Sequence, residues 1–81
     1  MITYQTLLPY VKAEPFRPFR INMASGKFYD IRHPEMVKLG KTFLLVYFYV
    51  SDEPEILDRW DTASLMLIEN ISFLDAPVGK N

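Results

Sequence analysis

The chain has 81 residues, of which 49% are hydrophobic and 15% aromatic, a net charge of −1 at pH 7 and no cysteine. A chain of this length forms one domain with a thin core, and without cysteine it can use neither disulfides nor a thiolate nucleophile or metal ligand. Its stability must come from dense apolar packing or from oligomerisation, and its aromatic content permits both.

The N-terminal segment, residues 1–14, is expected to contain a helix over residues 4–13. Thr3 suits the N-cap position, and apolar side chains follow at helical spacing. Pro9 conflicts with a helix interior because it has no N–H to donate. The helix therefore either begins at Pro9 or is kinked there. The two prolines that follow require an extended passage.

A period of two begins at Phe19 and predicts a β-hairpin with one buried face. Gly26 can adopt the positive φ that the tight turn after the first strand requires. The second strand starts at Phe28. It is interrupted at Pro34, which has no N–H for a strand ladder, before apolar character resumes at residue 36.

The central strand is expected over residues 42–50, because both of its sides are apolar and rich in aromatic and β-branched residues. Such a strand is either covered on both faces or used as an interface. The rest of the chain reads as an acidic loop over residues 51–55, a fourth strand over 56–62, a helical turn over 65–68, a last strand over 71–74 and a flexible tail over 75–81.

These elements predict a mainly β domain with an N-terminal helix and a bent five-strand antiparallel sheet over residues 19–74. Small sheets of this kind curl into barrels, which limits their exposed edges. The order of elements resembles the Sm-like members of the SH3-like barrels. Bacterial Sm-like RNA chaperones carry a Tyr-Lys-His near the last strand, whereas this chain reads Asp61-Thr62-Ala63-Ser64-Leu65. Their uridine pocket is therefore not carried over.

A second resemblance is closer in sequence. The segments PFRPFRI at residues 15–21, SGKFYDIRHPE at 25–35 and LMLIENISFLD at 65–75 resemble a group of small bacterial proteins. That group shows the pattern PFxPFxI, then SGxxxxIxHPE, then IxxIxxL. His-Pro-Glu is the most specific part of the match, and the resemblance implies no activity.

No stretch reads as a signal peptide or as a membrane helix. Residues 1–11 lack a basic start, and the longest apolar run covers residues 43–50, whereas a membrane helix needs about 20 residues. We therefore expect a soluble, cytoplasmic protein of bacterial type that does not act at a membrane.

The charges are distributed unevenly along the chain. Residues 12–41 hold seven basic and three acidic side chains, and residues 42–81 hold two basic and seven acidic ones. This asymmetry predicts a basic patch for an anionic partner, or complementary faces that meet in an oligomer, or charges that pair locally across strands. The basic side chains of the candidate anionic-partner face are Arg17, Arg20, Lys27, Arg32, Lys38 and Lys41.

Aromatic residues are interleaved with these cations, a pattern typical of proteins that bind single-stranded nucleic acid. The acidic isoelectric point of the chain argues against such binding. Binding of RNA or single-stranded DNA is therefore kept as the alternative function.

His33 and Glu35 could act as a base and an acid, or they could shape a strand bend around Pro34. No nucleophile with a partnered base accompanies them, so we predict no catalytic residues and no enzyme. We also predict no metal site and no cofactor. The single histidine is too few for a zinc site, and the acidic residues after position 51 lack the spacing of a calcium loop. The glycines are isolated, so they form no phosphate-binding loop.

Self-association is the preferred interpretation of the central strand. One side of it can be buried in a small barrel, and either the N-terminal helix or a neighbouring subunit must cover the other. We expect a homo-oligomeric interaction module that could also bind another protein. The candidate self-association residues are Phe43, Leu45, Tyr47, Tyr49 and Trp60.

Overall fold

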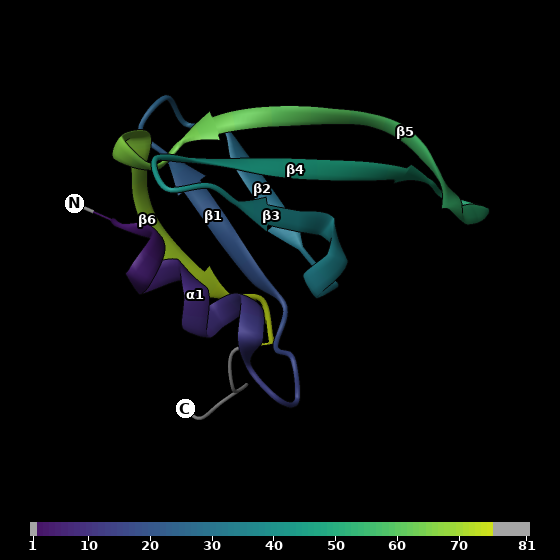
Figure 1. Ribbon diagram of the computed structural model, residues 1–81, viewed down its shortest axis with the longest axis horizontal. Coiled ribbons are helices and arrows are strands. Elements are labelled where there is room, and N and C mark those ends of the chain that lie inside the picture. Colours follow the sequence, from purple (N-terminus) through teal and green to yellow (C-terminus); the bar gives the residue numbers. More distant parts are fainter. Residues whose placement is uncertain (1, 76–81) are drawn as a thin grey trace.

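The computed structural model describes residues 2–75 and places two three-stranded antiparallel sheets beside one N-terminal helix (Figure 1). Sheet A has the strand order β2-β1-β6, and sheet B has the order β3-β4-β5. The elements are α1 (Tyr4–Lys12), β1 (Phe19–Met23), β2 (Phe28–Ile31), the 3₁₀ turn η1 (Pro34–Met36), β3 (Val37–Leu39), β4 (Phe43–Val50), β5 (Glu53–Ser64), the 3₁₀ turn η2 (Leu65–Leu67) and β6 (Ile68–Phe73).

The fold is thus mainly β, as predicted, but it is not a single five-strand sheet. The predicted second strand is divided by η1, so that β2 pairs with β1 while β3 pairs with β4. Pro34 begins η1 and has no N–H for a ladder, and the amide of Met36 instead bonds to the carbonyl of His33 (3.0 Å). The two halves of the strand can therefore join different sheets.

Helix α1 is continuous through Pro9, so the alternative in which the helix begins at that residue is wrong. Thr3 occupies the N-cap position, and its carbonyl accepts hydrogen bonds from the amides of Thr6 and Leu7 (3.0 and 3.2 Å). Among the residues that the structure describes, no helix has the length and apolar character needed to span a bilayer.

The β1–β2 hairpin closes through a tight turn at Gly26, as predicted. Gly26 has φ 96°, a left-handed conformation that glycine adopts without steric cost. The amide of Met23 bonds to the carbonyl of Lys27 (2.8 Å) and fixes the register that places Phe19 opposite Ile31.

The second half of the chain departs from the predicted boundaries. The acidic loop over residues 51–55 is wrong, because Val50 pairs with Glu53 and only Ser51 and Asp52 form the turn. Pro54 is compatible with β5 because that strand lies at the edge of sheet B, where a missing donor breaks no ladder bond. The last strand also begins earlier than predicted, at Ile68.

The predicted flexible tail, residues 75–81, lies outside the described residues except for Asp75. That residue forms an ion pair with Arg17 (3.1 Å).

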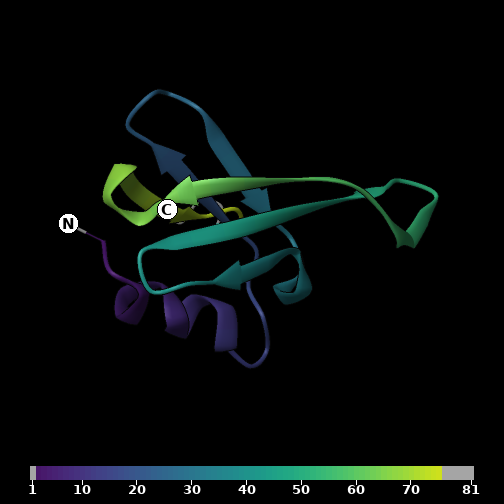
Figure 2. The same cartoon turned by 45° about the horizontal axis from the view of Figure 1, so that its top comes forward.

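The core lies between the two sheets and is closed along one side by α1 (Figures 1 and 2). Its largest fully buried side chains come from all three parts: Leu7, Phe19, Ile21, Ile31, Leu44 and Val46. Beyond this core, the far half of the β4–β5 hairpin projects away from the body of the molecule, and β5 is exposed from Glu53 to Trp60.

Candidate functional site

The alternation of β4 decides which side of the central strand is core. Leu44 and Val46 have no exposed surface, whereas Leu45 and Tyr47 between and beside them are only half-buried. Because successive side chains of a strand point to opposite faces, the side with Leu45 and Tyr47 is the outer side of sheet B. The sequence left this choice open.

The outer side of sheet B brings all five predicted self-association residues together. In the β4–β5 register, Trp60 lies opposite Tyr47 and Leu57 lies opposite Tyr49, so these side chains share one face with the rest of the outer side of β4. Trp60 is 58% exposed, Leu57 42% and Phe43 41%. We call this surface the apolar face; it consists of Phe43, Leu45, Tyr47, Tyr49, Leu57 and Trp60.

Leu57 was missed because of an irregularity in β5. Phe48 pairs with Arg59 and Tyr49 with Leu57, which leaves Asp58 as the extra residue of a β-bulge. The bulge shifts the alternation of β5, so residues three apart lie on the same face. A period-two reading of the sequence places them on opposite faces.

The N-terminal helix does not cover the apolar face. Its Leu7 is buried in the same core cluster as Leu44 and Val46, on the inner side of sheet B. Helix α1 therefore leaves the outer side of β4 uncovered, and at its far end Tyr49 contacts η1 through a hydrogen bond to the carbonyl of Glu35.

The β4–β5 hairpin has a basic end and an acidic end. Lys38 lies opposite Leu45 in the register, and Lys41 belongs to the turn that precedes β4. At the far end of the hairpin, three exposed carboxylates cluster in the sequence: Asp52, Glu53 and Glu55.

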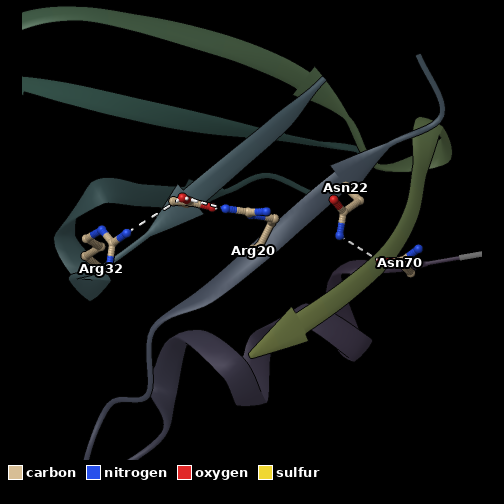
Figure 3. A network of polar contacts seen from close by, with 5 residues as sticks. Arg20, Asn22, Arg32 and Asn70 are labelled. Carbon is tan, nitrogen blue, oxygen red and sulfur yellow. Dashed lines mark hydrogen bonds and ion pairs between the residues drawn. The ribbon is translucent and has the colours of Figure 1, made fainter. Parts of the chain in front are cut away.

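The predicted basic face is mostly paired with acids of the same chain. On the outer side of sheet A, the guanidinium of Arg20 donates two hydrogen bonds to Asp30 (2.7 and 3.1 Å), and Arg32 lies 3.7 Å from the same carboxylate (Figure 3). Lys27 likewise pairs with Asp61 (3.0 Å). The Arg20–Asp30 pair joins neighbouring strands, as the local-pairing interpretation of the uneven charge expects, whereas Lys27 and Asp61 are 34 residues apart.

The six predicted cations also do not form one patch. Lys38 belongs to the outer side of sheet B, whereas Arg20 belongs to that of sheet A. Arg20 further covers the ring of Phe28, 4.1 Å from its centre, and the neighbouring Asn22 and Asn70 bond to each other (2.8 Å; Figure 3). Binding of single-stranded nucleic acid stays a prediction that none of these contacts favours.

The ion pairs lower the pKa values of their acids. Hydrogen bonding from Arg20 holds the pKa of Asp30 below its ordinary value, and hydrogen bonding from Lys27 does the same for the pKa of Asp61. A lowered folded-state pKa stabilises the protein at pH values above the unfolded-state pKa, and that stabilisation is lost as pH falls through the folded-state pKa.

We therefore expect the free energy of unfolding to fall below about pH 4, the ordinary range of an aspartate in an unfolded chain. Asp30→Asn should make this acid-side decline shallower, because one carboxylate with a lowered pKa is removed. Urea titrations at a series of pH values measure the slope of the unfolding free energy against pH for the parent protein and for the variant. Equal slopes in the two proteins would contradict the role of the Arg20–Asp30 pair.

His33 and Glu35 lie at η1, where their backbones have structural roles. The carbonyl of His33 accepts the Met36 amide, and the carbonyl of Glu35 accepts the hydroxyl of Tyr49 (3.2 Å). No hydrogen bond joins the two side chains among the contacts of residues 2–75, and no group of three or more potential metal ligands forms there. The residues shape the bend between β2 and β3.

Comparisons with known proteins assign no family. No protein family, curated protein or solved structure matches the chain. A function must therefore be argued from the geometry of the surfaces described above.

Proposed function

We propose that the protein is a non-enzymatic interaction module of the cytoplasm that forms a two-fold dimer through the apolar face. The observation that carries this proposal is the exposure of Trp60 beside Tyr47 on the outer side of sheet B, which α1 does not cover. Aromatic side chains at the centre of a patch are typical of interface hot spots. The order of elements, with η1 between β2 and β3 and the turn η2 before the last strand, supports an Sm-like arrangement of the sheets.

The charges at the two ends of the β4–β5 hairpin favour one orientation of a second copy. If two sheets stack with their β4 strands antiparallel, the end with Lys41 in each copy lies over the acidic hairpin end with Glu53 and Glu55 in the other. A two-fold axis forms this contact twice, because the basic end of each copy lies over the acidic end of the other. Parallel stacking would instead oppose like charges, so the charge pattern selects one orientation.

The area of the face limits the strength of the dimer. The two strands that form the apolar face are about 10 Å wide and eight residues about 26 Å long, which gives roughly 260 Å² per copy. A stable interface buries about 800 Å² per partner, so this dimer is expected to dissociate at micromolar concentrations. Its detection requires a concentration series.

The test is light scattering coupled to size exclusion, from about 10 to about 500 µM protein, a range that brackets the expected affinity. We expect the mass to rise from monomer to dimer, and Trp60→Glu to remain monomeric throughout. Phe28→Glu is the control, because Phe28 is 50% exposed but lies in sheet A, away from the apolar face. A monomer at every concentration, or equal effects of the two variants, would contradict the proposal.

A further inference from the structure

A pocket of about 380 Å³ lies between η1 and the turn end of the projecting β4–β5 hairpin. Its volume falls in the range of small-molecule sites, about 300–1,000 Å³. The site shares only Tyr49 with the apolar face, so the proposal made for it does not rest on the dimer. The residues that carry the argument are Arg32, His33, Met36, Tyr49, Val50 and Pro54.

The apolar walls of the pocket are held in place by hydrogen bonds. The Tyr49 hydroxyl donates to the carbonyl of Glu35 (3.2 Å), which fixes the ring against η1. The backbone amide of Arg32 lies 3.4 Å from the sulfur of Met36. Val50 and Pro54 complete the apolar lining from the hairpin side. The η1 wall of the pocket is thus fixed in advance, which lowers the ordering cost of binding an apolar group there.

Arg32 brings a cation with spare donors to this pocket. Its nearest acid, Asp30, already accepts two hydrogen bonds from Arg20 at 2.7 and 3.1 Å, and Arg32 stands 3.7 Å away as the second partner of that carboxylate. The Arg32 side chain is 62% exposed. A guanidinium has five N–H donors in a planar fork, which suits a carboxylate. His33 lies beside it on the same rim.

We propose that this pocket binds a small monocarboxylate with an apolar body. The carboxylate would pair with Arg32, and the body would contact Met36, Tyr49 and Val50. Glu35 also lines the pocket, so its negative charge disfavours a second carboxylate on the ligand. The site therefore favours a ligand that has one negative charge and one apolar group.

The experiment is a titration of the ¹⁵N-labelled full chain with phenylacetate, followed by amide chemical shifts. The expected dissociation constant is on the order of 1 mM, which matches the binding efficiency of small ligands. Shifts are expected at residues 32–36 and 49–51. Phenylacetamide, which lacks the charge, and phenylmalonate, which carries two charges, should each bind at least about fivefold more weakly.

Two variants separate the contributions of Arg32 and Glu35 to binding. Arg32→Gln should weaken the binding of phenylacetate about tenfold, because it removes the charged partner of the carboxylate. The binding of phenylacetamide should not change. Glu35→Gln should strengthen the binding of phenylmalonate relative to that of phenylacetate, because it removes the repulsion between Glu35 and the second carboxylate. Equal binding of phenylacetate and phenylacetamide, shifts confined to other regions, or an Arg32→Gln protein that binds like the parent would overturn the proposal.

Discussion

Replacing Val46 with aspartate is expected to unfold the protein, whereas the same replacement at Tyr47 is expected to leave it folded. Val46 has no exposed surface and packs in the core, so a carboxylate there would be buried without a partner. Such burial costs several kcal/mol in addition to the lost apolar contacts. A chain of 81 residues has a total stability of about 4–12 kcal/mol, so little or none would remain.

Tyr47 differs because its side chain lies on the outer side of the same strand. An aspartate at this position keeps its charge in water, opposite the exposed Trp60. The cost should be about 1 kcal/mol, the value typical of a substitution outside the core. The charge would, however, lie at the centre of the proposed dimer interface, so Tyr47→Asp should also be monomeric at every concentration.

Far-UV circular dichroism and amide shift dispersion measure folding, and light scattering measures mass. We expect Val46→Asp to lose the native spectrum and Tyr47→Asp to retain it. If both variants unfold, the outer side of β4 must be buried, and the assignment of the apolar face is wrong. If Tyr47→Asp folds and still dimerises, the dimer uses another surface.

The period-two pattern predicted the local strands because it depends only on neighbouring residues. The hairpin at Gly26 and the central strand near residues 43–50 appear where the alternation and the turn residues put them. The same pattern could not choose the core side of β4, because Leu44 and Leu45 are equally apolar. That choice depends on where α1 and sheet A lie, which only the tertiary structure decides.

The features that the sequence did not predict are long-range. Lys27 and Asp61 are 34 residues apart, so no local pattern could show that this cation is already paired. The bulge at Asp58 likewise depends on the partner strand, and it alone places Leu57 on the apolar face. Six cations in one half of the sequence therefore indicated a basic face that the fold distributes over two sheets.

Phe19→Ala should have a similarly large effect on stability, through lost packing rather than a buried charge. Phe19 has no exposed surface, and its ring lies 5.4 Å from that of Tyr10 in α1 and 5.9 Å from that of Phe16. It therefore joins the helix and the segment after it to sheet A. Truncating a buried phenylalanine costs about 3–5 kcal/mol, and urea unfolding followed by circular dichroism measures the loss.

Phe28→Ala is the control, because Phe28 lies in the paired strand but is 50% exposed and faces Arg20 on the outer side of sheet A. It should cost no more than about 1 kcal/mol, the scale of an exposed cation–π contact. The two variants remove the same side chain from neighbouring strands, so their difference isolates burial between the sheets. Similar losses would mean that the core is not enclosed by α1 and sheet A as described.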